Sequence, residues 1–415
     1  MDFNSKPSYV MLMDINSCFA TIEQQANPFL RGRPIVVAAY TSASGAILAA
    51  SYEAKKLGIK TGMRVADGKS ICPSLKILLP DPHKYRFVHL KLAKIISEYT
   101  DDFAAKSIDE FVLNLKDYPA LKNKSMQGVA RQIKEKIKTE IGEWITVSIG
   151  IAPNRYLAKI AANIKKPDGL VEINKDNFLE VYSKLKLTDL TGIKVGNARR
   201  LNSMGIYTVL DFYQSPIWKL KAAFHSITGL YWHTRLRGYE IDKEEFKRRS
   251  YGNSVAIGRD VKTKAELSPI LARLTEKTAF RLRQADYKAR GVHLAIVYKD
   301  GTFWHKGGLL QYDLESSQEI FRVALNLLSI ASPKKSVRNI AVSVFSLVKH
   351  DSYQPDLFEK VSENKDLTKA SDLINKKWGD FTLHLGRSLL SKSDVKDRIA
   401  FGGVKELEGL QSRQP

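Results

Sequence analysis

The sequence has little cysteine and no long hydrophobic run. Its two cysteines, Cys18 and Cys72, are too few for a disulfide framework or an all-cysteine zinc site. No apolar run approaches the roughly 18 residues that a membrane-spanning helix needs. The first residues lack the apolar stretch and cleavage pattern of a secretory signal. We therefore expect a protein of the reducing cytoplasm that does not span a membrane.

Acidic residues are also scarce relative to basic ones. The 415 residues include 66 Lys and Arg against 44 Asp and Glu, a net charge of +22. An excess of this size favours a polyanionic partner, nucleic acid above all, and the alternative is a basic protein without such a partner. Residues 243–349 hold 20 Lys and Arg against 10 Asp and Glu, so this quarter of the chain carries nearly half of the net charge.

The distribution of apolar residues predicts a folded α/β chain of several domains. Hydrophobic residues make up 44% and charged residues 27%, which is typical of chains with a packed core. Strand-like and helix-like patterns alternate as far as residue 166. Strands are predicted at 9–13, 34–39, 107–115 and 144–151, and helices at 85–99, 128–141 and 153–164. Short helices follow over 170–240, then a charged linker over 239–250, and strands with amphipathic helices over 251–349.

Three carboxylates are the first candidates for catalysis. Asp14 ends the first apolar strand, and Asp109 and Glu110 interrupt the strand at 107–115. Adjacent strand residues point to opposite faces, so at least one acid of this pair starts near the core, where an unpaired carboxylate is costly. Three carboxylates that hold two Mg²⁺ on a triphosphate form the apparatus of nucleotidyl transfer. The alternatives are a helix-capping role for Asp14 and neutralisation of the acids by nearby Lys or Arg.

Tyr52, Lys55 and Lys159 are candidates for binding the triphosphate. Tyr52 and Lys55 are three residues apart and share about the same face of a predicted helix, and Lys159 lies early in another helix. Ammonium and hydroxyl donors that face a metal site suit β- and γ-phosphates. Taken singly, such residues are more often solvated surface residues.

Two further segments have the features of binding surfaces. Gly192 and Gly196 mark a short turn between predicted helices, with Arg199 and Arg200 beside it, as in a helix–hairpin–helix that grips the DNA backbone. The alternative is an ordinary helical corner. Residues 354–358 (QPDLF) combine a polar anchor with a Leu-Phe pair, a pattern typical of peptide docking, or of a loop that packs on its own domain.

Taken in order, five motifs closely resemble those of the Y-family translesion DNA polymerases, the group of UmuC, DinB, ImpB, MucB and SamB. They are DINSCF at 14–19, YEAKK at 52–56, SIDE at 107–110, NRYLAKIA at 154–161 and KPDG at 166–169. The resemblance covers roughly residues 7–350. The Asp-x-Asn opening and the long C-terminal region are more similar to the UmuC-type branch than to the shorter DinB type.

This resemblance implies a low-fidelity, DNA-templated DNA polymerase that copies past damage, with primer–template DNA and dNTP as partners. It makes Asp14, Asp109 and Glu110 the catalytic carboxylates and the ligands of two Mg²⁺, with the carbonyl of Ile15 as a further ligand. Phe19 matches the steric gate that excludes a ribose 2′-hydroxyl.

The resemblance also implies roles around these residues. Tyr52, Lys55 and Lys159 match the triphosphate contacts. Ile47 and Leu48 match residues that lie over the nascent base pair. Cys18, beside the gate, is implied to be a packing residue rather than a nucleophile.

The implied architecture is that of a right-hand polymerase of the α/β (α+β) class. It has a ferredoxin-like palm (1–15 and 76–166), small fingers (16–75), a helix–hairpin–helix thumb (167–240), an α+β little finger (250–350) and a C-terminal extension (351–415). Gln354, Leu357 and Phe358 resemble the peptide that binds the sliding clamp (β clamp), and UmuC-type relatives imply accessory subunits. The rival hypothesis is a non-catalytic DNA-binding or clamp-associated accessory protein that has lost an acid, and here all three acids are present.

Overall fold

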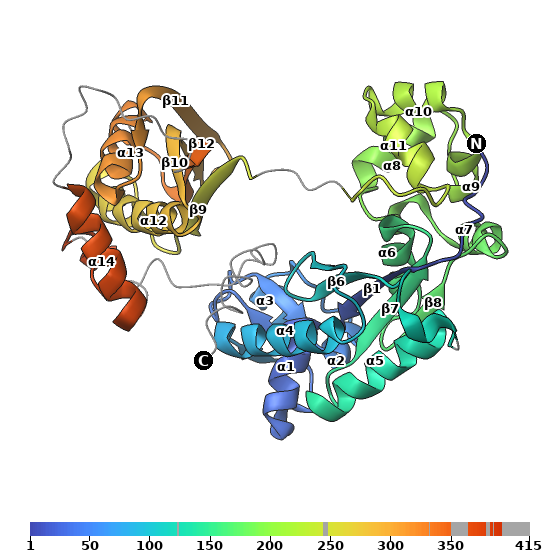
Figure 1. The fold of residues 1–415 in the computed structure, drawn as a ribbon. Helices are drawn as coiled ribbons and strands as arrows, with labels where there is room; N and C mark the ends of the chain where they lie inside the picture. Colours follow the sequence, from blue (N-terminus) through green and yellow to red (C-terminus); the bar gives the residue numbers. More distant parts are fainter. Residues whose placement is uncertain are drawn as a thin grey trace. The chain divides into compact units, whose positions relative to one another are not determined.

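A computed structural model describes residues 1–122, 124–243, 248–331, 333–349, 364–378, 382–384 and 386–391. The chain forms two compact units, Met1–Glu244 and Glu245–Asp397 (Figure 1). The division between them falls in the charged stretch that the sequence marks as a linker. Among the helices of the described part, none has the length and apolar character that a membrane crossing requires.

A five-stranded sheet forms the centre of the first unit, in the order β5-β6-β1-β7-β8. Its strands are β1 (Val10–Ile15), β5 (Phe103–Ala105), β6 (Glu110–Asn114), β7 (Val147–Ala152) and β8 (Leu170–Glu172). Strand β1 pairs antiparallel with β6 and with β7, and β8 pairs parallel with β7. All six residues of β7 are buried, which explains why these strands are continuously apolar in sequence.

Helices cover both faces of this sheet. Met11 and Met13 belong to a core with α1 (Cys18–Ala26), α4 (Pro82–Ser97) and α5 (Met126–Glu140). Leu12, between them, belongs to a second core with α6 (Arg155–Ile164). This alternation follows from the two-residue period of a strand. Helix α6 packs closely because β7 has Gly150, where a Cβ atom would lie 2.0 Å from the carbonyl oxygen of Ala158.

A smaller sheet carries its own core within the first unit. Strands β2 (Ile35–Ala38), β3 (Ile47–Ala50) and β4 (Lys76–Leu78) are ordered β3-β2-β4. Helices α2 (Tyr52–Lys56) and α3 (Val65–Ile71) follow β3. Ile47, Ala50 and Ala54 are buried together in this cluster. The side-chain oxygen of Ser51 accepts a hydrogen bond from the Ala54 amide and so begins α2 directly after β3.

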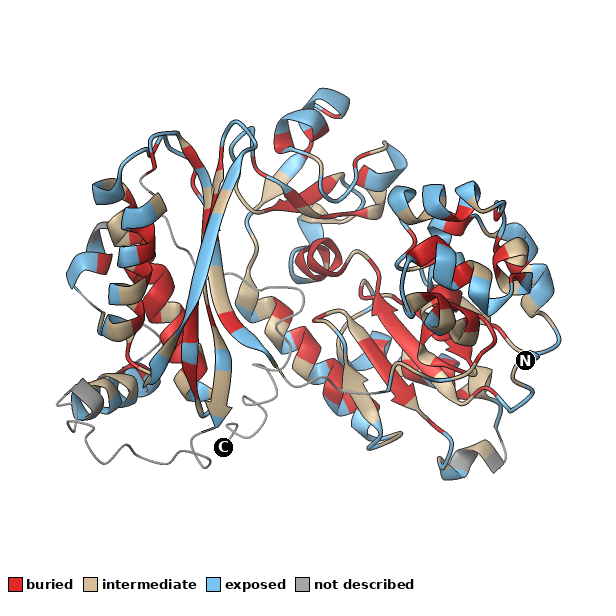
Figure 2. Ribbon diagram, turned by 90° about the horizontal axis from the view of Figure 1, so that it is seen from above, coloured by how far each residue is buried: buried red, intermediate tan, exposed pale blue. Residues whose placement is uncertain are grey.

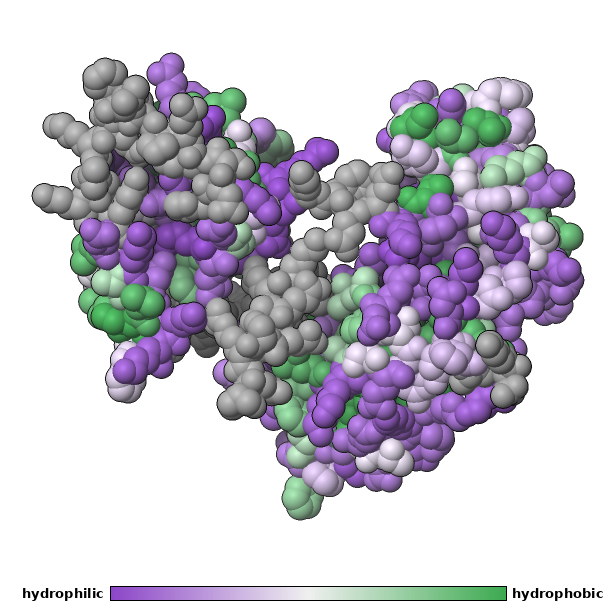
Figure 3. Space-filling view, in the orientation of Figure 1, coloured by the Kyte–Doolittle hydropathy of each residue, from purple (hydrophilic) through white to green (hydrophobic). Residues whose placement is uncertain are grey.

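The rest of the first unit is helical. It contains the short 3-10 helix η3 (Leu187–Asp189) and the helices α7 (Phe178–Lys184), α8 (Val195–Ser203), α9 (Val209–Gln214), α10 (Ile217–Phe224) and α11 (Thr228–Arg235). Phe212, Phe224 and Trp232 pack in the same core as Leu12 and α6. Hydrophobic side chains also lie on the surface of this segment (Figure 3). The chain forms β8 in the five-stranded sheet before it turns helical, so the boundary predicted at residue 166 cuts off the last strand of that sheet.

The second unit has a four-stranded antiparallel sheet in the order β11-β10-β12-β9. The strands are β9 (Ser250–Ala256), β10 (Tyr287–Tyr298), β11 (Phe303–Leu314) and β12 (Val337–Lys349). Helices α12 (Lys264–Gln284) and α13 (Ser317–Ala331) form a core with one face of the sheet. Strand β11 is exposed along most of its length (Figure 2). Helix α14 (Asn364–Trp378) is joined to α12 by an ion pair between Arg283 and Asp372.

Candidate active site

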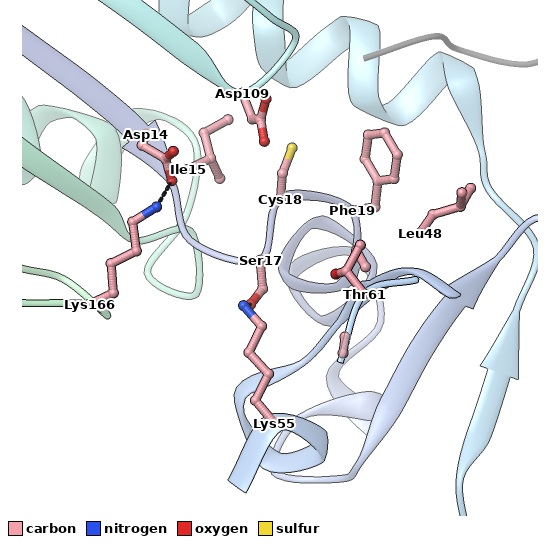
Figure 4. A pocket seen from close by; sticks show the side chains of 12 residues that line it. Asp14, Ile15, Ser17, Cys18, Phe19, Leu48, Lys55, Thr61, Asp109 and Lys166 are labelled. Carbon is pink, nitrogen blue, oxygen red and sulfur yellow. Dashed lines mark hydrogen bonds and ion pairs between the residues drawn. The ribbon is translucent and has the colours of Figure 1, made fainter. Parts of the chain in front are cut away.

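One pocket of roughly 250 Å³ gathers residues from the two sheets of the first unit (Figure 4). It is lined by Asp14, Ile15, Ser17, Cys18, Phe19, Leu48, Ala49, Ala50, Lys55, Thr61, Asp109 and Lys166. The end of β1 and the start of α1 form one side, and β3 and α2 form another. Most of the residues singled out in the N-terminal motifs therefore meet in one place.

The strand pairing brings the three carboxylates together. Asp14 in β1 lies opposite Glu110 in β6, and the Ile15 amide donates a hydrogen bond to the Asp109 carbonyl (2.9 Å). Strand β6 begins at Glu110, so Asp109 precedes it rather than lying within a strand as predicted. The Ser107 hydroxyl donates to the Asp109 carboxylate at 2.5 Å. Because the strand begins between the two acids, Asp109 lines the pocket while Glu110 is turned to a different partner.

Burial and neighbouring acids raise the pKa of Asp14 and of Asp109. Burial is the largest cause, and repulsion from Asp109 and Glu110 adds to it, so the pKa of Asp14 rises to about 6 despite the opposing effect of Lys166. Burial also raises the pKa of Asp109, with repulsion from Glu110, against the hydrogen bond from Ser107. The pocket thus holds negative charge that the surrounding protein compensates only in part.

Two lysines pair with two of the acids. Lys166 Nζ donates to Asp14 Oδ1 at 2.5 Å, and Lys159 Nζ lies 2.8 Å from both oxygens of Glu110. The alternative left open in the sequence analysis, that lysines neutralise the acids, therefore holds for Asp14 and Glu110. Asp109 instead accepts a hydrogen bond from the Ser107 hydroxyl.

Sequence reasoning missed Lys166 as a site residue, because the KPDG motif was used for the family resemblance without a role for its lysine. The loop is held against β1 by Asn16, whose side-chain oxygen accepts from the Asp168 amide (2.8 Å) and whose amide donates to Ser148 (2.8 Å). Ser148 in turn accepts from the Gly169 amide. The signal that was available is Lys166 itself, the first residue of the KPDG motif.

Tyr52 and Lys55 adjoin the same pocket from α2. Lys55 Nζ donates to the Ser17 hydroxyl at 2.6 Å and lies 4.6 Å from the centre of the Tyr52 ring. Desolvation lowers the pKa of Lys55, and repulsion from Lys166 lowers it further. Burial raises the pKa of Tyr52. The two lysines Lys55 and Lys166 are therefore close enough to repel each other, as in a site built for an anion, whereas Lys159 lies at Glu110 and does not line the pocket.

Phe19 forms a fixed wall of the pocket. Its side chain is 1% exposed and stacks on Tyr85, with ring centres 4.2 Å apart and an angle of 9° between the planes. The Tyr85 hydroxyl donates to Glu23, which also pairs with Lys84. Cys18 beside it is buried with a free thiol, and burial raises its pKa, so it remains protonated and packs. Leu48 also lines the pocket, whereas Ile47 is in the small core behind it.

The donor set fits a hard divalent cation in part. Carboxylate oxygens are the ligands that Mg²⁺ prefers, and Asp14 and Asp109 present them in one pocket where burial makes a counter-charge favourable. Within the described ranges, no three His, Cys, Asp or Glu side chains are grouped as a complete metal site. Glu110 is held by Lys159. Asp109 therefore fits the ion as it stands, whereas Asp14 fits once it leaves Lys166 and Glu110 once it leaves Lys159.

The predicted DNA-binding turn lies in the helical segment. Gly192 is exposed with φ of 94°, a conformation that favours glycine, and precedes α8. Gly196 is the second residue of α8 rather than part of the turn, and Arg199 and Arg200 are exposed on the same helix. The segment before the turn is the 3-10 helix η3, not a full helix. The predicted clamp-binding residues Gln354, Leu357 and Phe358 lie outside the described residues.

The fold and this site define a class: a multidomain α/β protein with carboxylates on neighbouring strands of its central sheet and cations facing them. Residues 13–163 match the impB/mucB/samB family, and residues 248–357 match the C-terminal domain of that family. The chain is 32% identical to DNA polymerase IV of Moorella thermoacetica and 30% identical to DNA polymerase IV of Pelotomaculum thermopropionicum. These matches cover 92% and 94% of this chain and 96% and 97% of the relatives.

Solved structures agree with the sequence relatives. A Y-family DNA polymerase chimera of Dbh and Dpo4 is 26% identical, with a TM-score of 0.72, and the match covers 82% of this chain and 99% of the chimera. An insertion ternary complex of Dbh DNA polymerase is also 26% identical, with the same coverage and a TM-score of 0.57.

The chain belongs to the impB/mucB/samB family, the Y-family of DNA polymerases. It is a DNA-directed DNA polymerase whose function is translesion synthesis, and the accessory-protein hypothesis is not supported. Enzymes of this family are metal-dependent nucleotidyltransferases. The family and fold class predicted from the motifs are thus confirmed. The assignment to the UmuC-type branch stays a prediction, since these relatives carry the name DNA polymerase IV.

Proposed function

We propose that the pocket is the nucleotidyl-transfer site, with Asp14, Asp109, Glu110 and the carbonyl of Ile15 as ligands of two Mg²⁺. When bound, these ions would polarise the α-phosphate of a dNTP and activate the 3′-hydroxyl of a primer. The protein contributes the position of the carboxylates, set by the pairing of β1 with β6. The observation that carries the proposal is that Asp14, in β1, and Asp109, directly before β6, line one pocket together with Lys55 and Lys166.

The triphosphate is proposed to lie against Tyr52, Lys55 and Lys166. Both ammonium groups are in or beside the pocket, and their mutual repulsion is relieved by an anion between them. In this scheme Lys166 leaves Asp14 for a phosphate when the nucleotide arrives. Lys159 was predicted as a further phosphate contact; that role stays a prediction, and it requires Lys159 to break its ion pair with Glu110.

Phe19 is proposed as the steric gate. A steric gate has to keep its position when a ribose 2′-hydroxyl contacts it. Phe19 is held in position by its stack on Tyr85, whose hydroxyl donates a hydrogen bond to Glu23. Low fidelity then has its origin in a site with few contacts to the nascent base pair, so that selection rests mainly on base pairing.

The remaining parts of the proposal concern partners and domains. The five-stranded sheet serves as palm, the small sheet as fingers, the helices of residues 173–240 as thumb and the second unit as little finger. Primer–template DNA is bound by this framework, with Arg199 and Arg200 of α8 on the backbone. Residues 354–358 engage the sliding clamp, accessory subunits join in UmuC-type fashion, and the enzyme works in the cytoplasm where the DNA is.

Primer extension with Mg²⁺ and all four dNTPs tests the proposal. Templates with and without an abasic site are copied by the wild type, by Asp109→Ala and by the matched control Asp101→Ala, an exposed acid of the same unit. We expect Asp109→Ala to lose extension and keep DNA binding, and Asp101→Ala to resemble the wild type. Extension by Asp109→Ala would refute the ligand assignment, whereas loss in both variants would point to a folding defect, which thermal unfolding detects.

A further inference from the structure

Two histidines of the second unit lie side by side on the sheet. His293 is in β10 and His305 is in the neighbouring strand β11, in a register where His293 faces Gly307 and Ala295 faces His305. The two rings are therefore diagonal neighbours on one face. His293 Nε2 and His305 Nδ1 are 3.2 Å apart. His305 is exposed and His293 half-buried, so solvent reaches the pair.

Local packing holds both rings in this arrangement. Phe303 stacks on His305 with ring centres 5.8 Å apart and an angle of 16°. Gly307 leaves room for the other ring, because a Cβ atom there would lie 3.0 Å from His293 Cδ2. Trp304 and Lys306 alternate with these residues along β11 and so project from the opposite face. The pair is thus oriented by its neighbours before any ligand arrives.

We propose that His293 and His305 form a chelating site for a borderline divalent transition metal ion such as Zn²⁺, Ni²⁺ or Cu²⁺, with water as the remaining ligands. Imidazole nitrogens bind such ions at about 2.0–2.1 Å, so two of them on a tetrahedral or square centre lie roughly 2.9–3.4 Å apart. The observed separation of 3.2 Å falls in this range. One ion can therefore replace the shared proton once the two rings turn so that both nitrogens face a point beside the line that joins them.

The chemistry of the pair favours this class of ion. Imidazole is a borderline ligand that suits Zn²⁺, Ni²⁺ and Cu²⁺, whereas Mg²⁺ prefers oxygen. Burial and the nearby His305 lower the pKa of His293, which keeps its ring neutral near pH 7, the form that binds a metal. The site uses no residue of the pocket in the first unit, so it is independent of the proposed Mg²⁺ ligands.

A bound ion would link β10 to β11 through the two imidazole rings, in addition to the backbone hydrogen bonds between the strands. Strand β11 is an edge strand, and most of its residues are exposed. An ion that binds only when the two strands are paired stabilises the folded hairpin by mass action. It would also add positive charge to this sheet.

Cu²⁺ electron paramagnetic resonance and Zn²⁺ titration on the full chain test the inference, with excess Mg²⁺ present to occupy carboxylate sites. The wild type is expected to bind one equivalent of Cu²⁺ with the superhyperfine pattern of two imidazole nitrogens. His293→Gln and His305→Gln should each weaken binding at least about tenfold. The matched control is His83→Ala, an exposed histidine of the first unit, which should bind as the wild type does.

The thermal transition of the second unit gives an independent readout. Zn²⁺ should raise its midpoint in the wild type and in His83→Ala but not in either glutamine variant. Unchanged binding and spectrum in the double glutamine variant would overturn the proposal. So would a wild type without any two-nitrogen signal. Equal metal-free unfolding of all variants establishes that they are folded.

Discussion

Replacement of Asp14 by asparagine should stabilise the metal-free enzyme while it removes activity. The pKa of Asp14 is raised from 3.8 to about 6. At about 1.4 kcal/mol per pKa unit, the ionised side chain costs the folded state about 3 kcal/mol at neutral pH. Asparagine resembles the protonated acid and lacks this penalty. Allowing for relaxation of the site around the charge, we expect a gain of about 2 kcal/mol.

The sign of the pH dependence follows from the raised pKa. Below pH 3.8 the carboxyl is protonated in the folded and unfolded states, so it has no effect. As the pH rises toward about 6 the unfolded chain ionises first, and the folded state loses stability relative to it. The difference between Asp14→Asn and the wild type should therefore grow over this interval and stay constant above it.

Calorimetric unfolding in EDTA from pH 4 to pH 8 measures this difference. About 2 kcal/mol corresponds to roughly 4–8 °C in the midpoint of the first unit. Asp101→Asn, an exposed acid, should show no such change. Addition of Mg²⁺ should stabilise the wild type and not Asp14→Asn. A variant less stable than the wild type at pH 7.5, or a difference that does not vary with pH, would refute the reasoning.

Three other predictions concern neighbouring residues. Phe19→Leu should allow ribonucleotide incorporation, measured as a fall in the selectivity for dNTP over rNTP. It should also lower the free energy of unfolding by about 1 kcal/mol, because the ring is fully buried. Unchanged selectivity would exclude Phe19 as the gate. Lys166→Met should raise KM for dNTP, whereas Lys159→Met should lower kcat through Glu110, and the reverse pattern would contradict the assignments. Arg199→Ala with Arg200→Ala should weaken DNA binding and reduce its salt dependence by up to about 2 in the log–log slope, and an unchanged slope would remove these residues from the interface.

The sequence was sufficient for strands β1, β6 and β7 of the central sheet and for most of the pocket, for identifiable reasons. β-branched residues buried on both sides make β7 evident, and Asp14 follows an apolar run that can only be a strand. Motif order located Phe19 and Lys55 as well. Lys166 was missed because a Lys-Pro-Asp-Gly segment is equally typical of a turn, and only the fold shows that the turn lies against Asp14.

Other differences arose from short elements. Strand β8 has three residues, too few for a periodic signal, and it is recognised only by its pairing with β7. The ion pair of Glu110 with Lys159 could not be predicted either. It depends on where β6 begins and on the face that α6 presents, and both are tertiary facts.

The core that β1 shares with the helices of residues 173–240 bears on how polymerases of this kind can be recombined. Leu12 packs in one cluster with Phe212 and Trp232, and Asn154, which caps α6, donates hydrogen bonds to the carbonyls of Arg235 and Tyr239. A hybrid joined near residue 166 would split the sheet and this cluster. A hybrid joined at 244–247 separates two units with independent cores. The first unit and the second unit can therefore be inherited or exchanged as whole modules, and the helical segment alone cannot.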